Sequence, residues 1–302
     1  SLDWNWKVGS IMTRKVPRSL KEQIQALPEE KASQFHDLKS EVNIIFSERD
    51  LRTARRENCL REMTIFRSNR IESEEGTDVI FLVLSLINHS CAPNAEECSL
   101  LNGSEDQENV DEYELRAIKD IFKGEEITMI MDFIGAISSK TERQRKLKEK
   151  FGFQCKCCVC SGHVDDQDSI IEKIQDTLMY TGVLLFNSPL ALAMRYETSL
   201  DEWKIFAVQN GILMALSQQL HIGSVKVKIM FCKTAVTTAQ MARDSVRLNK
   251  AMDVLKELVM TTGFEKLRLE YEKIEETIAE WAPQFNSKKP PTKEEINSFY
   301  DD

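Results

Sequence analysis

Four of the chain's eight cysteines fall within six residues, at Cys155, Cys157, Cys158 and Cys160. Each disulfide needs its own Cβ geometry, so a cluster this dense does not suit several separate bridges. It suits Zn²⁺, which takes four thiolate or imidazole ligands in a tetrahedron. The Cys-x-Cys-x-x-Cys spacing of Cys155, Cys157 and Cys160 lets one tight turn present three sulfurs to one ion. The sequence therefore predicts a structural zinc site, with Cys158 facing away as a free thiol.

The fourth ligand must come from elsewhere, and the residues alone leave two candidates. Cys91 lies in a distant Asn-His-Ser-Cys segment, whereas His163 follows Cys160 by three residues. The alternative is a reduced cysteine cluster without metal, which is disfavoured because unliganded thiols at this density oxidise readily. The N-terminal residues show no secretory signal pattern, so a reducing compartment is the default and we expect the nucleus or the cytoplasm.

Composition narrows the class of protein and of partner. The 302 residues suffice for two domains, and 42% hydrophobic with 29% charged residues is ordinary for a soluble globular chain. The formal charge of −9 disfavours general binding to phosphate backbones and fits a protein or peptide partner, although an acidic excess of this size is also a solubility feature. We expect no specific nucleic-acid binding and, since no apolar run reaches about 18 residues, no membrane span.

The first half of the chain mixes helical and strand patterns. Residues 24–46 carry a helical period, and residues 48–70 mix arginines with acids, as on a salt-bridged solvent face. Residues 79–87 are expected to be a buried segment. Residues 95–101 and 113–118 predict a strand pair joined by an exposed loop.

The pattern then changes from strands to helices. Lys123-Gly124 predicts a turn into an apolar strand over 127–133, and the charged residues 140–150 predict a helix. From about 167 to 283, helical periods dominate. The clearest helical face consists of Leu267, Tyr271, Ile274, Ile278 and Trp281.

Three segments resemble the signatures of SET-domain methyltransferases. The first is Leu86–Asn94, which reads Leu-Ile-Asn-His-Ser-Cys-Ala-Pro-Asn. The second is Ala117–Thr128, which runs through a Lys-Gly turn into Glu-Glu-Ile-Thr, and the third is Phe151–Cys160, which is similar to the post-SET zinc motif. Their order and separations match the family. The helical second half resembles the SET/MYND-like branch, although the MYND finger of that branch is absent from this sequence.

The resemblance implies an α+β fold in two parts. The first part is a SET domain of small curled β-sheets with a helical insertion and a post-SET zinc site. The second part is an all-α, helical-repeat-like domain that we expect to hold a protein partner. The expected bounds are 1–137 for the SET domain, incomplete at its N-terminus, with the insertion over about 20–62, then 138–162 for the post-SET zinc motif, 163–285 for the helical domain and 286–302 for a flexible tail.

The resemblance also implies roles for individual residues. It favours Cys91 over His163 as the fourth zinc ligand, beside Cys155, Cys157 and Cys160. The expected contacts with the cofactor S-adenosylmethionine are Asn69, Asn88, His89 and Phe153. The expected lysine-channel residues are Ile71 and Phe151. Read by residue type alone, Asn88 would be a turn cap and His89 a core histidine.

The activity implied is transfer of a methyl group from S-adenosylmethionine to a lysine amine of a histone or another protein. Two departures bear on it. In the first, Met131 stands where the family places a tyrosine, and Phe151 also lacks a hydroxyl. In the second, residues 1–20 lack the expected Gly-x-Gly turn. Loss of one preorganised donor costs roughly a hundred- to a thousandfold in other enzymes. The alternatives are a catalytically impaired SET-fold interaction module, or a zinc-stabilised interaction protein without cofactor.

Overall fold

The structure is a computed structural model in which part of the chain is described. The described residues are 5–9, 12–13, 20–38, 48–72, 78–99, 112–131, 137–162, 167–181, 198–221, 223–287, 289 and 291–292. The chain divides into two compact units, one comprising Ser1–Met131 with Lys140–Cys160 and the other Asp132–Ser139 with Ser161–Asp302. None of the described helices combines the length and the apolar character that crossing a membrane requires.

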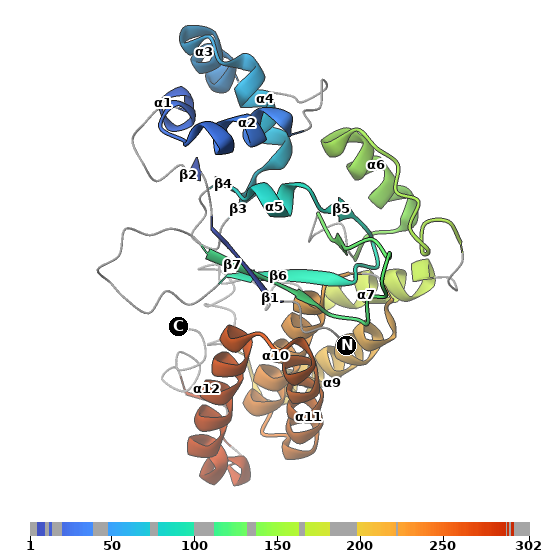
Figure 1. Ribbon diagram of the computed structural model, residues 1–302. Helices are drawn as coiled ribbons and strands as arrows, with labels where there is room; N and C mark the ends of the chain where they lie inside the picture. The colour runs from blue at the N-terminus through green and yellow to red at the C-terminus, as the bar shows by residue number, and fades with distance from the viewer. Residues whose placement is uncertain are drawn as a thin grey trace. The chain divides into compact units, whose positions relative to one another are not determined.

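Three small sheets organise the first unit (Figure 1). The first has the order β1-β7-β6, the second the order β2-β4-β3, and the third is the pair β5-β8. The strands are β1 (Asn5–Gly9), β2 (Met12–Thr13), β3 (Ile71–Glu72), β4 (Asp78–Ile80), β5 (Asn88–His89), β6 (Ala95–Ser99), β7 (Glu112–Ala117) and β8 (Thr128–Met129). Small sheets in this part of the chain and a largely helical remainder confirm the predicted fold class in its coarse form.

The predicted strand pair is confirmed. β6 and β7 are antiparallel, with Ala95 opposite Ala117 and Ser99 opposite Tyr113. Alternate positions of a strand share a face, so Tyr113 and Leu115 point together into a core. That core consists of Phe81, Leu84, Ala95, Tyr113, Leu115 and Met129. The sequence analysis missed β1, which pairs with the other edge of β7 and completes this sheet.

Among the described residues between β2 and β3 there are four helices, which run past the expected insertion of about 20–62 to Asn69. They are α1 (Leu20–Gln25), α2 (Glu29–Asp37), α3 (Glu48–Glu57) and α4 (Leu60–Asn69). Phe35, Ile65 and Phe66 bury their side chains in one core with Ile80 of β4. Part of the predicted period over 24–46 is therefore seen as α1 and α2, and residues 39–47 lie outside the described residues.

The segment 79–87 corrects one expectation. It was expected to be buried throughout, and Ile80 and Phe81 are fully buried, one in each of the two cores. The chain then turns into α5 (Leu82–Ser85), which exposes one side. Leu86 is 72% exposed, because a helical turn cannot direct every side chain inward.

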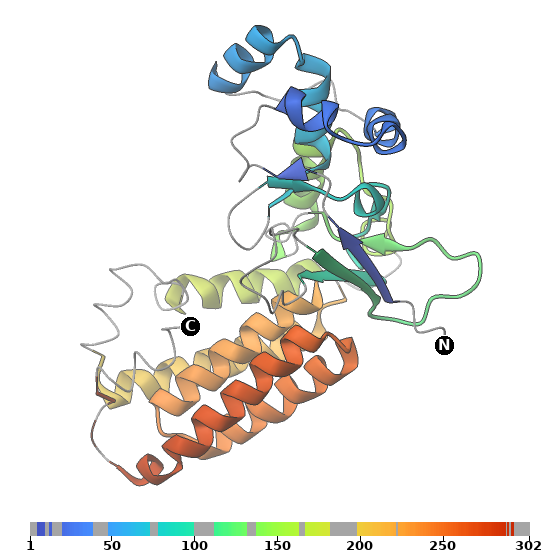
Figure 2. The same ribbon diagram turned by 60° about the vertical axis from the view of Figure 1, so that its left-hand side comes forward.

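The second unit consists of helices among its described residues. They are α7 (Gln167–Thr181), α9 (Leu200–Gln219), α10 (Val225–Met241), α11 (Ser245–Thr262) and α12 (Glu265–Trp281), followed by the 3₁₀ helix η3 (Ala282–Asn286). Figure 2 shows α9, α10 and α11 running side by side. Short connections with capping residues make them neighbours: Ser224 caps α10 and Asp244 caps α11.

Local sequence explains where several of these helices begin and end. Ser199 and Glu202 form a capping box at the start of α9. Gly263 ends α11 at a φ of 65°, which a residue with a side chain rarely adopts. The predicted face of α12 is confirmed, since Leu267, Tyr271 and Trp281 are buried. The predicted domain bounds stay a prediction, and most of the predicted tail over 286–302 lies outside the described residues.

Candidate functional site

The Asn-His-Ser-Cys segment is held against the end of β8. Asn88 and His89 form β5, which runs parallel to β8 with Asn88 beside Thr128 and His89 beside Met129. The N–H of Ser90 donates to the carbonyl of Met129 at 3.0 Å. Residues nearly forty positions apart in the chain are thereby fixed side by side by backbone hydrogen bonds.

Asn94 fixes the far end of the same segment, and its side chain is buried. Its Oδ1 accepts the N–H of Thr128 at 2.8 Å, and its Nδ2 donates to the carbonyl of Glu126 at 2.9 Å. Its backbone N–H donates to the Thr128 carbonyl at 3.3 Å, and its carbonyl accepts from Ile118 at 2.9 Å. One asparagine therefore joins the ends of β6, β7 and β8.

The Lys-Gly-Glu-Glu signature is a turn followed by two anchoring carboxylates. The predicted turn is confirmed: the Glu125 N–H donates to the Phe122 carbonyl at 2.9 Å, and Gly124 has a φ of 90°, which requires a residue without Cβ. The Glu125 carboxylate accepts the Phe122 N–H at 3.0 Å. The Glu126 carboxylate accepts the side-chain amide of Asn88 at 2.6 Å. The two signatures thus contact one another.

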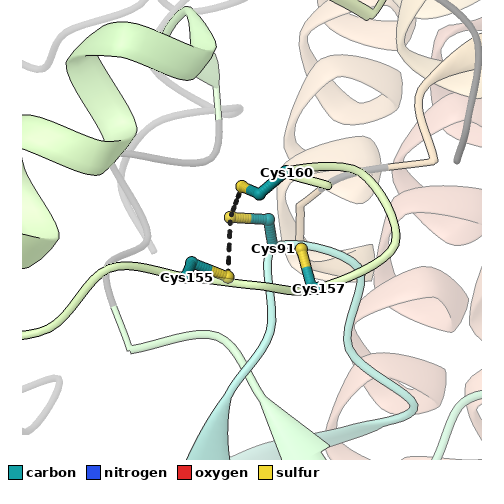
Figure 3. Close-up of side chains that lie close together, drawn as sticks. All are labelled: Cys91, Cys155, Cys157 and Cys160. Carbon is teal, nitrogen blue, oxygen red and sulfur yellow. Dashed lines mark hydrogen bonds between the residues drawn. The ribbon is translucent and has the colours of Figure 1, made fainter. Parts of the chain in front are cut away.

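Four cysteine sulfurs converge in the first unit. Cys91, Cys155, Cys157 and Cys160 have all their Sγ atoms within 4.8 Å of one another (Figure 3). The Cys91 Sγ lies 3.9 Å from that of Cys155 and 3.5 Å from that of Cys160. Zinc–sulfur bonds of about 2.3 Å in a tetrahedron separate sulfurs by about 3.8 Å, so the spacing is compatible with zinc. Cys158 is exposed and lies outside the cluster, as predicted.

Burial and the neighbouring sulfurs perturb the pKa values of these thiols. Hydrogen bonds to Cys155, Cys157 and Cys160, and burial after them, raise the pKa of the Cys91 thiol. Hydrogen bonds from Cys157, Cys160 and Cys91 lower the pKa of the Cys155 thiol. Four sulfurs at this spacing share protons, because four adjacent thiolates repel one another in a buried site. A divalent ion among them removes that repulsion.

Helix α6 (Lys140–Phe151) holds the cysteine loop from one side. Gln144 uses both ends of its amide on one residue of the loop. Its Nε2 donates to the Cys155 carbonyl at 2.8 Å, and its Oε1 accepts the Cys155 N–H at 3.0 Å. The predicted helix over 140–150 is confirmed. Through Gln144, it holds the backbone of Cys155, a candidate zinc ligand, with two hydrogen bonds.

His89 lies close to Phe153, another of the expected cofactor residues. Its ring lies 5.8 Å from that of Phe153, which in turn lies 6.4 Å from Phe151. The His89 Nδ1 accepts the backbone N–H of Met131 at 3.1 Å. The side chain of Met131 is 37% exposed. Met131 is therefore linked to the His89 ring by its backbone N–H. Phe151 lies near Phe153, whose ring is close to that of His89.

Asn69 is the last residue of α4, and Ile71 is the first residue of β3. The Asn69 side chain donates to the Ile65 carbonyl at 2.8 Å, and the Asn69 carbonyl accepts the Ser85 hydroxyl at 3.3 Å, which places the end of α4 against α5. The backbone of Ile71 pairs with Val79. The side chain of Ile71 and all of His163 lie outside the described residues, so their predicted roles stay predictions.

Sequence reasoning missed three residues that build the site. Asn94 and Glu126 lie within the quoted signatures, but polarity alone does not reveal that they bridge strands. Gln144 had no signal at all, since a glutamine on a charged helix usually faces solvent. Only the tertiary arrangement identifies these positions.

Residues 8–130 match the protein-family model described as "SET domain". This part of the chain is similar to SET domains. Among curated proteins, the chain is similar to histone-lysine N-methyltransferase set5 of Schizosaccharomyces pombe, with 37% identity over 52% of this chain and 41% of that protein. Human histone-lysine N-methyltransferase SMYD3 is 33% identical over 53% of this chain and 34% of its own length. ASHR1 of Arabidopsis thaliana, another histone-lysine N-methyltransferase, is 36% identical over 31% of this chain and 18% of its own length.

The family-model match contains two of the three signatures, Leu86–Asn94 and Ala117–Thr128. The relatives are SET and SMYD-type methyltransferases, which confirms the resemblance drawn from the sequence. The chain spans less than half the length of these curated relatives.

Proposed function

We propose that this chain transfers a methyl group from S-adenosylmethionine to a lysine amine of a histone or another protein. The observation that carries the proposal is the similarity of residues 8–130 to SET domains, a range in which Asn88 and His89 lie in parallel pairing beside β8. The names of the relatives, histone-lysine methyltransferases, support the same class of reaction.

We propose that Asn69, Asn88, His89 and Phe153 hold the cofactor. The cofactor, held by these residues, would supply a methyl group on a positively charged sulfur to a neutral lysine amine. The pairing of β5 with β8 fixes the backbone polar groups of Asn88 and His89 in the folded chain. Cofactor binding therefore does not have to order these groups. The Glu126 carboxylate orients the Asn88 amide. Phe153, half-buried beside His89, offers an aromatic surface for an adenine ring.

We propose that Cys91, Cys155, Cys157 and Cys160 bind one structural Zn²⁺. The donor set supports this: four sulfurs, three of them buried, lie at a spacing compatible with a tetrahedron around one ion. The ion would join the loop after α6 to the segment that follows β5. Its binding free energy would then stabilise the fold around Phe153.

One experiment tests the enzymatic proposal directly. Purified, zinc-replete chain is incubated with methyl-labelled S-adenosylmethionine and either core histones or a cell extract. We expect label on lysine, and no label when Asn88→Ala protein replaces it. Absence of transfer by folded protein that binds the cofactor would contradict the proposal.

A second candidate is a SET-fold interaction module with impaired catalysis. Met131 favours it, because a thioether stands at the position of the family's tyrosine. In this reading the helical unit carries the function. An exposed apolar row at successive turns of α9 supports protein contact there: Ile205, Val208 and Ile212 are 57%, 40% and 48% exposed. Cofactor binding without methyl transfer is the result that would favour this candidate.

A further inference from the structure

His89 uses both of its ring nitrogens, each on a different part of the site. Nδ1 accepts the backbone N–H of Met131 at 3.1 Å, and Nε2 lies 3.4 Å from the Sγ of Cys91. Because Nδ1 is an acceptor, the neutral ring carries its proton on Nε2. The ring therefore presents an N–H group to the Cys91 sulfur, and the backbone of Met131 fixes the tautomer.

The sulfur that receives this N–H is unlike the other three. Cys91 comes from the segment after β5, whereas Cys155, Cys157 and Cys160 come from the loop after α6, as Figure 3 shows. The Phe153 ring packs near the same imidazole. The imidazole thus faces the Cys91 sulfur, one aromatic ring and the backbone of Met131 after β8.

We propose that His89 is a positioning residue that couples the zinc site to the backbone of Met131. The inference rests on the proposed zinc site. Four thiolates around Zn²⁺ leave two excess negative charges, and an N–H directed at one sulfur draws part of that charge away, as outer ligands of metal sites do. The same ring then sets the position of Met131, where the family places its tyrosine. Metal binding at Cys91 and the geometry at Met131 are joined through one side chain.

Two substitutions separate the ring's two functions. In His89→Gln, the amide nitrogen takes the place of Nε2, so a donor to Cys91 remains while the acceptor for Met131 is lost. In His89→Asn, the carbonyl oxygen takes the place of Nδ1, so the acceptor for Met131 remains while the donor to Cys91 is lost. Both variants remove the ring and its packing with Phe153, so each controls for the other.

The metal readout uses Co²⁺ in place of zinc, because its sulfur-to-metal charge-transfer band reports the electron density on the thiolates. In His89→Asn we expect this band at longer wavelength than in the parent, and Co²⁺ affinity lowered by about tenfold. In His89→Gln we expect both to match the parent. The band belongs to the bound metal, so it can be read even from a less stable variant.

The second readout is hydrogen exchange of the Met131 amide, followed in peptides that cover residues 128–137. Here the order reverses: His89→Gln should lose protection, and His89→Asn should keep it. A parent protein that binds no Co²⁺ would overturn the proposed zinc site and this inference with it. Normal Co²⁺ binding with identical behaviour of the two variants, whether both unchanged or both equally impaired, would overturn the role of His89 alone.

Discussion

Burial distinguishes Cys91, in the segment after β5, from Cys158, in the loop after α6. Cys91 is buried within reach of three other sulfurs, whereas Cys158 is exposed and lies outside the cluster. We therefore expect Cys91→Ser to weaken zinc binding by at least about tenfold and to lower the melting temperature, because the hydroxyl is a poor replacement for a thiolate. Cys158→Ser is the matched control and should behave as the parent. Zinc content and thermal melting measure both, and equal damage from the two substitutions would contradict the ligand assignment.

Met131 offers a second test on one side chain. Its backbone is fixed by His89 and its side chain is partly exposed, so a larger residue has room there. If the chain is a methyltransferase limited by the missing hydroxyl, Met131→Tyr should raise the rate of methyl transfer by about a hundredfold. Met131→Phe adds the ring without the hydroxyl and should stay near the parent rate. A rise in both variants would assign the effect to packing instead.

At the scale of elements, α6 stabilises the cysteine loop through Gln144. Gln144→Met keeps the helix propensity and the size of the side chain but removes both hydrogen bonds to Cys155. The backbone N–H and carbonyl of Cys155 then lose these partners. We expect a loss of about 2 kcal/mol in the free energy of unfolding, measured by urea denaturation with zinc present. Lys148→Met, at an exposed position of the same helix, should change it by less than about 0.5 kcal/mol. Similar losses in both would show that the clamp contributes little.

How well the elements could be predicted depended on how local their signals are. β6 and β7 could be predicted because two short strand-like runs lie on either side of an acidic, Gly-containing stretch that suits an exposed loop. β1 was missed because its five residues pair with β7 more than a hundred positions away, and no local pattern encodes that partner. The burial expected for Leu86 failed because a run of apolar residues does not distinguish a strand from a helical turn.

The whole molecule explains why the site was only partly predictable. Three zinc-ligand candidates follow from local spacing, but Cys91 lies 64 residues before Cys155 and was chosen over His163 through a family resemblance. Contacts between residues this far apart are set by tertiary packing, which periodicity and composition do not contain.

The division into two units leads to a prediction about the whole chain. All four candidate ligands lie in the unit of Ser1–Met131 and Lys140–Cys160, so removal of zinc should weaken that unit first. With a chelator, we expect faster hydrogen exchange in residues 88–99, 112–131 and 140–160.

The helices of the second unit should keep their protection, because α10 and α11 bury their own apolar side chains, such as Phe231, Ala235 and Leu255, independently of the cysteines. Mass spectrometry resolves the exchange by peptide, and Cys91→Ser protein is the control, since the chelator should change nothing further in it. An equal loss of protection across residues 225–262 would show instead that the two units unfold as one cooperative body.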